Sequence, residues 1–243
     1  MKTSKKVLWL AAIATSAVMV GCVEAETDEE KKGEEITSGS FDGHTFRAKV
    51  EDGSFYNERI DEVKIWFTDY SYGRDTFVVA NGKYTNGGFT LNFVETIPDK
   101  YLQKITNYYS IYDLIYDPIV VSDTTAKYRG WDSWSLGAYK NGKPVGYFRC
   151  LSSATPRDEL NNGRVVFVAD FMYLNKSVSI IGKYDYDYGD EYSLVYNMVL
   201  KKGWNIHIVQ VPDNTGNRNL FSIDTYPGDT NELKWYFFLP GEW

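Results

Sequence analysis

The sequence predicts an all-β fold, an antiparallel β-sandwich or a barrel-like body, arranged as one large domain or as two sandwich-like modules. Two observations predict it. Apolar residues alternate with polar ones, as in Val63, Ile65 and Phe67 against Lys64 and Trp66, which is the pattern of a half-buried strand. Runs of this kind recur about every ten residues and are separated by glycine-containing turns.

The expected strands follow one another through the second part of the chain, at 44–50, 62–68, 76–81, 88–94, 134–139, 145–151, 164–170, 177–184, 192–200, 204–211, 219–223 and 233–239. The breaks between them contain Asn81-Gly82, Asn86-Gly87-Gly88, Asn141-Gly142, Asn162-Gly163, Gly189-Asp190 and Lys202-Gly203. Because Asn and Gly both tolerate positive φ angles, the Asn-Gly breaks predict hairpin turns.

One short helix is expected at 98–105, within this succession of strands. Pro98 suits a first helical position, and Tyr101, Leu102 and Ile105 have helical spacing. The helix would close the first half of the body. We therefore expect an N-terminal β module over 40–118 and a C-terminal β module over 119–243.

The first residues have the order of a secretory signal. A basic start with Lys2, Lys5 and Lys6 precedes an apolar run from Val7 to Val20. The run is shorter than the roughly 20 apolar residues that a membrane span needs. The sequence therefore predicts a signal peptide over 1–21 and export of the chain.

The residues that end this run also predict a lipid anchor. Met19-Val20-Gly21-Cys22 resembles the lipobox of bacterial lipoproteins, with Met19 in a position where Leu is usual. The resemblance implies that the Cys22 thiol is acylated and that Cys22 becomes the new N-terminus. An ordinary signal peptide with an incidental cysteine, or an uncleaved anchor, are the alternatives, and either would still export the chain.

An acidic stretch over 22–39 follows the predicted lipid site. Val23 and Ile36 are its only sizeable apolar side chains, so it cannot bury enough surface to offset its ordering entropy. We expect a disordered tether. It resembles the acidic stretch that sends some lipoproteins of Gram-negative anaerobes to the outer face, and a plain solvated spacer is the alternative. The expected location is the outer membrane, facing the periplasm or the cell surface, with the membrane as partner through the lipid.

Composition excludes some partners and bonds. The net charge of −7 disfavours nucleic acid as a partner. If Cys22 is acylated, Cys150 is the remaining one of the two cysteines, so no internal disulfide is possible. Cys150 follows Tyr147-Phe148-Arg149 in a strand-like run, where a lone cysteine behaves as a small buried apolar residue.

Several short sequence segments of the predicted β domain together resemble a group of uncharacterised lipoproteins from Gram-negative gut anaerobes. The resemblance implies an all-β lipoprotein of unknown activity. It transfers no site residue, because the matching segments are turns and strands. They are Gly87-Gly88-Phe89-Thr90-Leu91, Pro98-Asp99-Lys100-Tyr101-Leu102, Ala138-Tyr139-Lys140-Asn141-Gly142-Lys143, Leu200-Lys201-Lys202-Gly203-Trp204-Asn205 and Leu233-Lys234-Trp235-Tyr236.

No catalytic motif stands out in the sequence. The two histidines, His44 and His207, lie in strand-like contexts, and no Gly-x-Ser-x-Gly turn is present to expose a nucleophile. The acids offer no preferred pair for glycoside cleavage. We therefore assign no catalytic residue, no metal ligand and no cofactor, and keep a hydrolase acting on an extracellular polysaccharide as the alternative function.

The segment 183–192 is the most unusual part of the chain. Its acids Asp185, Asp187, Asp190 and Glu191 could offer oxygens to calcium, but Gly189 stands fifth from Asp185 where a calcium loop needs glycine sixth. The favoured interpretation is a hairpin arm with tyrosines on one face and aspartates on the other.

Aromatic residues point to a binding surface. The chain has 20 Tyr and 7 Trp, and such rings, where exposed, stack on sugars or on protein partners. We expect the exposed rings at Trp131, Trp134, Tyr186 and Tyr188. The expected function is a non-enzymatic, lipid-anchored binding or structural module with a glycan or protein partner. A subunit of a surface assembly is the third possibility.

Overall fold

A computed structural model of the chain describes residues 39–69, 75–107, 119–131, 136–162, 164–188, 190–211, 220–225 and 233–241. By its internal contacts the chain divides into two units, Met1–Glu34 and Glu35–Trp243, and all described residues belong to the second unit. The predicted signal peptide and Cys22 lie outside the described residues, as does the predicted tether apart from Gly39.

The described residues form an all-β fold, as predicted, in which all named strand pairs except that of β13 with β15 are antiparallel. The strands in this part of the chain are β1 (Ser40–Asp42), β2 (Thr45–Lys49), β3 (Glu62–Asp69), β4 (Asp75–Thr85), β5 (Gly88–Phe93), β6 (Gln103–Lys104), β7 (Val120–Val121), β8 (Lys127–Trp131), β9 (Leu136–Lys140), β10 (Lys143–Leu151), β11 (Val166–Leu174), β12 (Val178–Tyr188), β13 (Asp190–Leu200), β14 (Gly203–Val211), β15 (Leu220–Thr225) and β16 (Lys234–Phe238).

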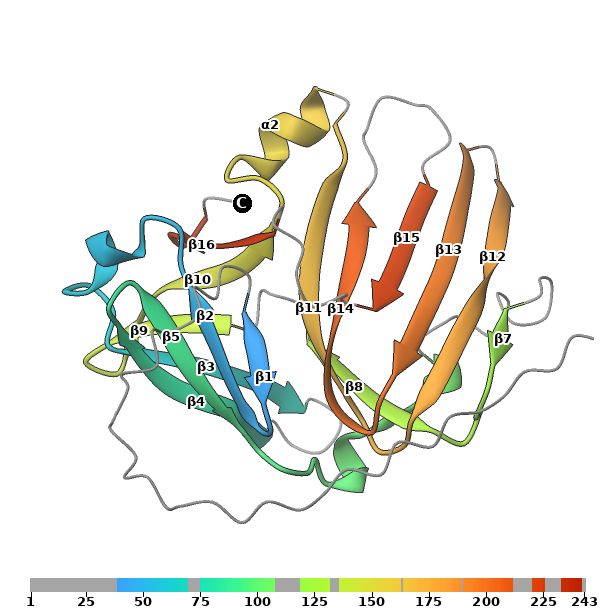
Figure 1. The fold of residues 1–243 in the computed structure, drawn as a ribbon, viewed down its shortest axis with the longest axis horizontal. Coiled ribbons are helices and arrows are strands. Elements are labelled where there is room, and N and C mark those ends of the chain that lie inside the picture. Colours follow the sequence, from blue (N-terminus) through green and yellow to red (C-terminus); the bar gives the residue numbers. More distant parts are fainter. Residues whose placement is uncertain are drawn as a thin grey trace, which may run out of the picture. The chain divides into compact units, whose positions relative to one another are not determined.

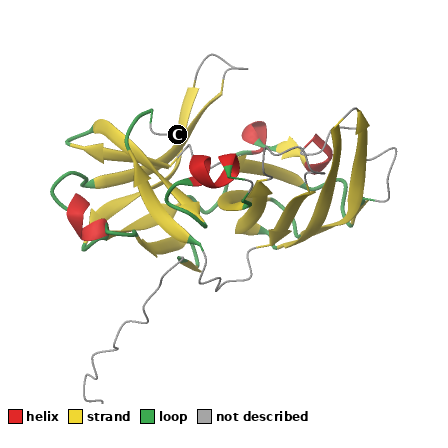
Figure 2. Cartoon of the chain, turned by 90° about the horizontal axis from the view of Figure 1, so that it is seen from above, coloured by secondary structure: helices red, strands yellow, loops and turns green. Residues whose placement is uncertain are grey.

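Hydrogen bonds join these strands in the order β1-β2-β5-β4-β3-β9-β10-β11-β14-β15-β13-β12-β7. In addition, β10 pairs with β16, β11 with β8, and β8 with β6. We name β1 to β5, β9, β10 and β16 the N-terminal sheet, and β7, β8 and β11 to β15 the C-terminal sheet (Figure 1). Figure 2 shows these two groups of strands from above. The fold is sandwich-like, and its described strands form no closed barrel.

Two of the predicted Asn-Gly hairpin turns have the expected geometry, whereas Asn162 instead ends the helix α2 (Pro156–Asn161) and Gly163 lies outside the described residues. Asn86-Gly87 has φ angles of 53° and 75°, and Asn141-Gly142 has 50° and 73°, as two-residue hairpin loops require. The prediction of a turn at Asn81-Gly82 is wrong, because both residues lie inside β4 and pair with β3 on one side and β5 on the other. A Cβ on Gly82 would lie 1.6 Å from the carbonyl oxygen of Thr90, so this glycine permits a close approach of β5.

The predicted helix at 98–105 is two short 3-10 helices instead. They are η2 (Asp99–Tyr101) and η3 (Ile105–Asn107), with β6 between them. Leu102 has extended backbone angles, which end the first turn. The α-helix of the described chain is α2 (Pro156–Asn161), which begins with Pro156 at its first turn, and a further 3-10 helix, η1, spans Gly53–Tyr56. None of the helices in the described ranges is long and apolar enough to cross a membrane.

Strand pairs and core contacts cross the predicted boundary near residue 118. β3 pairs with β9, and Val50, which follows β2, forms a parallel bridge with Trp235 of β16. The largest core cluster also contains residues from both sides, among them Phe46 and Phe148. Within the described ranges, the two predicted modules therefore share one network of strands and the largest core cluster.

Aromatic rings fill the centre of this core. The fully buried ring of Phe46 lies 5.1 Å from Phe171 and 5.8 Å from Trp235 between centroids, both in edge-on geometry. Phe89 also meets Trp235 edge-on, at 5.1 Å. Edge-on pairs contribute roughly 0.5–1.5 kcal/mol beyond area burial, so this cluster holds β2 and β5 against β16 and β11.

The C-terminal sheet has a core cluster of its own. Met172 and Leu174 of β11 and Met198 of β13 are fully buried on one of its faces. Ile105 of η3 and Ala126 belong to the same cluster and cover that face. A third, smaller cluster includes Leu151, Val166, Val168 and Phe238, with Leu160 of α2 packed against it.

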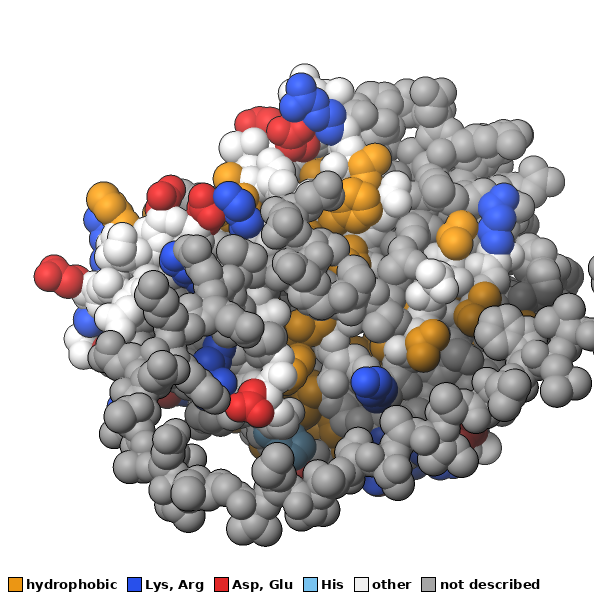
Figure 3. All heavy atoms as spheres, viewed as in Figure 1, with side chains coloured by type: hydrophobic (Ala, Val, Ile, Leu, Met, Phe, Trp, Pro, Cys, Tyr) orange, Lys and Arg blue, Asp and Glu red, His pale blue; other side chains and the backbone are white. Residues whose placement is uncertain are grey.

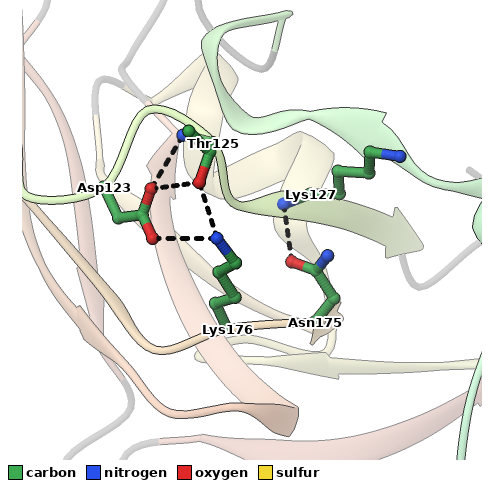
Figure 4. A network of polar contacts seen from close by, with 5 residues as sticks. All are labelled: Asp123, Thr125, Lys127, Asn175 and Lys176. Carbon is green, nitrogen blue, oxygen red and sulfur yellow. Dashed lines mark hydrogen bonds and ion pairs between the residues drawn. The ribbon is translucent and has the colours of Figure 1, made fainter.

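A polar network fastens the segment before β8 to the turn between β11 and β12 (Figure 4). The Asp123 carboxylate accepts hydrogen bonds from the Thr125 amide, at 2.8 Å, and the Thr125 hydroxyl, at 2.6 Å. Lys176 donates to the same hydroxyl at 2.6 Å, and Asn175 accepts from the Lys127 amide at 2.8 Å. The Thr125 hydrogen bonds, with help from Lys176, lower the pKa of Asp123. The contacts are local to exposed turns and give this cluster a structural role.

Candidate functional site

The outer side of the N-terminal sheet is a continuous polar surface, which we name the polar face. Its residues alternate along each strand with buried residues of the core, such as Phe46, Leu91 and Val63. The polar face consists of Asp42, Thr45, Arg47, Lys49, Glu62, Lys64, Trp66, Asn81, Lys83, Thr85, Thr90, Asn92, Gly137 and Tyr139.

Strand register arranges these side chains in two cross-strand rows. The first row runs through Arg47, Thr90, Lys83, Glu62 and Tyr139, each directly opposite the next. The second row runs through Asp42, Thr45, Asn92, Asn81, Lys64 and Gly137. Adjacent strands are about 4.8 Å apart, so the first row spans about 19 Å from β2 to β9.

Two aromatic side chains stand at one end of these rows. The Trp66 indole N–H donates a hydrogen bond to the Tyr139 hydroxyl oxygen at 2.7 Å, and Trp66 is 41% exposed. A Cβ on Gly137 would lie 2.9 Å from the Tyr139 ring, so the ring lies across the glycine. The Lys64 ammonium nitrogen is 5.1 Å from the centroid of the same ring. These contacts hold the two rings in place at the surface.

A groove runs between the polar side chains of β3, β4 and β5. It has a volume of about 620 Å³ and is open to solvent. Its lining combines carboxylate, amide, hydroxyl and ammonium groups, from Asp61, Glu62, Asn81, Gly82, Lys83, Thr85, Thr90 and Asn92. A site for a small drug-like ligand is usually enclosed and mostly apolar, so this groove better suits a polar ligand that lies along the surface.

The two carboxylates of the groove already have cationic neighbours. Glu62 lies 2.6 Å from the Lys64 nitrogen, and Asp61 lies 3.8 Å from Lys140 and accepts a hydrogen bond from the Asn141 amide at 3.0 Å. The two acids are neighbours in sequence and come from one strand end. They do not face each other from opposite walls, which glycoside cleavage by two carboxylates requires.

The support beneath the polar face is rigid. Tyr84 of β4 points inward, is 3% exposed, and donates its hydroxyl proton to the Gly53 carbonyl oxygen at 2.8 Å. Burial raises the pKa of this tyrosine, so it stays protonated. The Tyr84 ring stacks on Phe148 at 5.6 Å. Rings that fit in this way leave β4 little freedom to move, and the groove keeps its shape.

A second group of chemically active residues is buried and cannot meet a ligand. Arg149 of β10 and His207 of β14 are each 4% exposed. Burial lowers the pKa of His207 to about 4, so the imidazole is neutral at pH 7. Cys150 is 1% exposed, as expected from the sequence, and burial raises the pKa of its thiol. These residues belong to the interior of the fold.

The residues expected to form a binding surface fall where their side chains are not described. Trp131 ends β8 and Trp134 lies outside the described residues. Tyr186 and Tyr188 lie in β12, where Tyr186 pairs with Tyr192 of β13, so the backbone forms the expected hairpin arm. A binding role for these four residues stays a prediction, and so does the acylation of Cys22.

Sequence reasoning missed Trp66 and Tyr139 as site residues. The signal for Trp66 was present, because it alternates with the buried Ile65 and Phe67 and so faces outward with Lys64. No local signal placed Tyr139 beside it, since their hydrogen bond joins residues 73 positions apart.

The other described surfaces give weaker evidence for a ligand site than the polar face does. Among the described residues no group of histidine, cysteine, aspartate or glutamate side chains could hold a metal ion. Hydrophobic side chains are scattered over β12 and β13 in the view of Figure 3. The exposed apolar residues there include Ile181, 50% exposed, and its register partner Val120, 63% exposed. Exposed Lys183 and Asn197 lie among them, which is ordinary for a protein surface.

Comparison of the chain with protein-family models, with curated proteins and with solved structures finds no match. The function must therefore be argued from the site itself.

Proposed function

We propose that this chain is a lipid-anchored lipoprotein of the cell envelope that binds a glycan, without cleaving it, on the polar face of its N-terminal sheet. The anchor rests on the signal-like start and on Gly21-Cys22, and the acidic stretch over 22–39 supports an outer-membrane position. The binding function rests on one observation above all. Two surface rings, Trp66 and Tyr139, are fixed beside rows of amide, hydroxyl and charged groups.

This combination matches the chemistry of a sugar. One side of a pyranose ring is rich in C–H groups and stacks on an aromatic ring, whereas its hydroxyls need hydrogen-bond partners. The Tyr139 oxygen accepts from Trp66 and keeps its own proton to donate. Asn81 and Asn92, in the second row, carry both donors and acceptors.

The extent of the polar face favours a chain of sugars over a single one. The first row crosses five strands, and the groove beside it is open along the surface. A single sugar would contact only part of such a surface. An oligosaccharide would place one residue on the rings and the next ones against the polar rows.

The test is a glycan array probed with the full-length protein, followed by calorimetry on each oligosaccharide bound. Removal of a stacking ring in Trp66→Ala should cost about 2 kcal/mol or more in binding. Gly137→Ala should also weaken binding, because its Cβ would displace the Tyr139 ring while both rings remain. Phe55→Ala is the matched control, since Phe55 is 71% exposed and lies outside the polar face.

Melting temperatures measured alongside separate binding from folding. Trp66→Ala and Gly137→Ala should melt close to the unchanged protein, because both positions are at the surface. If the bound oligosaccharide keeps full affinity for both variants, the polar face is not the binding site. If the array shows cleaved products, the non-enzymatic part of the proposal fails.

A further inference from the structure

The polar face is cationic, although the chain as a whole is acidic. Arg47, Lys49, Lys64 and Lys83 point outward on this face, against Asp42 and Glu62. The whole chain has a net charge of −7. A local excess of positive charge on an acidic protein attracts anionic ligands to that surface.

The cations of this face differ in how far their charge is already neutralised. Lys64 lies 2.6 Å from the Glu62 carboxylate, so the charges of this pair largely cancel. Arg47 lies 3.7 Å from Asp42, and both side chains are more than half exposed, at 51% and 84%, where water and salt weaken the pair. Lys83 makes no ion pair with any residue that the structure describes.

The two weakly paired cations flank one position. Thr90 of β5 lies directly opposite Arg47 of β2 on one side and directly opposite Lys83 of β4 on the other. Directly opposite residues have Cβ atoms about 5 Å apart, and both cationic side chains are long enough to reach over a threonine between them. The Thr90 hydroxyl adds a hydrogen-bond donor at the centre.

We infer that the polar face selects acidic glycans, and that a carboxylate or sulfate group of the sugar lies above Thr90 between Arg47 and Lys83. The arginine fork and the lysine ammonium both donate charge-assisted hydrogen bonds to such a group. The inference rests on the proposed glycan-binding function and adds the substrate class. In this arrangement the rings of Trp66 and Tyr139 supply stacking to any sugar, and the two cations supply the preference for acidic ones.

The test uses oligosaccharides in matched pairs and the full-length protein. Each uronate-containing oligomer is compared with its carboxyl-reduced form, and each sulfated oligomer with its desulfated form. We expect binding of the acidic member of a pair to be at least about tenfold tighter, because the neutral member cannot accept a charge-assisted hydrogen bond from Arg47 or Lys83. The two kinds of pair show whether carboxylate or sulfate is the preferred group.

Variants locate the preference on the face. Lys83→Gln and Arg47→Gln should each weaken binding of the acidic member about tenfold and leave the neutral member unchanged. Trp66→Ala should weaken both members equally. Lys202→Gln is the matched control, because it removes the same charge from an exposed lysine of the C-terminal sheet's β13–β14 turn.

The outcomes separate the inference from the function on which it rests. If neutral members bind as tightly as acidic ones, the inference fails and glycan binding stands. If the preference for acidic members survives in both Lys83→Gln and Arg47→Gln, the assigned position is wrong. If the array contains no bound oligosaccharide, the proposed function and the inference fail together.

Discussion

The buried His207 should make the protein lose stability in mild acid, at a pH where exposed histidines have little effect. Burial lowers the pKa of His207 to about 4 from an ordinary value near 6.5. Above pH 6.5 the imidazole is neutral in both the folded and the unfolded chain, so it contributes no pH dependence. Below 6.5 the unfolded chain binds a proton that the folded chain does not, and stability falls until the pH reaches the folded-state pKa.

The size of this loss follows from the shift in pKa. One bound proton corresponds to a slope of about 1.4 kcal/mol per pH unit, and the interval from 6.5 to about 4 gives a loss of about 3 kcal/mol. That is a large part of the stability of an ordinary domain, which is about 5–15 kcal/mol.

The assay is urea unfolding of the full-length protein at a series of pH values between 7.5 and 4. Between pH 6.5 and 4, the free energy of unfolding of His207→Gln should fall less steeply with pH than that of the unchanged protein. This expectation holds whatever the absolute stability of the variant. His44→Gln is the control, because His44 is exposed and is the second of the chain's two histidines. In NMR spectra, the His207 imidazole signal should not have moved by pH 5. Equal slopes in all three proteins, or a His207 imidazole that titrates near 6.5, would refute the burial argument.

Two further predictions concern the cysteines. A thiol reagent should modify Cys150 at least about a thousandfold more slowly in the native protein than in denaturant. The reason is that the core excludes the reagent until the protein unfolds. Fast labelling of the native protein would contradict the placement of Cys150 in the interior. Cys22→Ser should abolish incorporation of a labelled fatty acid and release the protein from the membrane fraction, and a variant that still carries the label would show that the anchor is elsewhere.

Most of the strands could be predicted because their signal is local. The alternation of buried Phe89, Leu91 and Phe93 with Thr90 and Asn92 is visible in the sequence, and β5 spans these residues. The strands that were missed, β1, β6, β7 and β8, are short. β6 and β7 have two residues each and β1 has three, which is too few for a period to show, and β8 pairs with β6 and β11, which lie far from it in sequence.

The prediction of a turn at Asn81-Gly82 is wrong because strand pairing outweighs a local signal that is clearly present. The dipeptide favours a hairpin by itself, but Asn81 is paired with Lys64 on one side and Asn92 on the other. Ladders on both edges outweigh the local preference of two residues. The same reasoning applies at 98–105, where the extended backbone of Leu102 and the pairing of β6 with β8 interrupt a pattern that would suit a helix.

The polar face could not be predicted, because its composition depends on register between strands that are far apart in sequence. Thr90 meets Arg47 and Lys83 because the buried residues of β2, β4 and β5 fix which positions lie opposite one another. A slip of one residue would bury Lys83 and expose Leu91, which is 0% exposed. The apolar core therefore enforces the alignment of the cations. A substitution in the core that shifted this register would remove the anionic-ligand position without touching any residue that lines it.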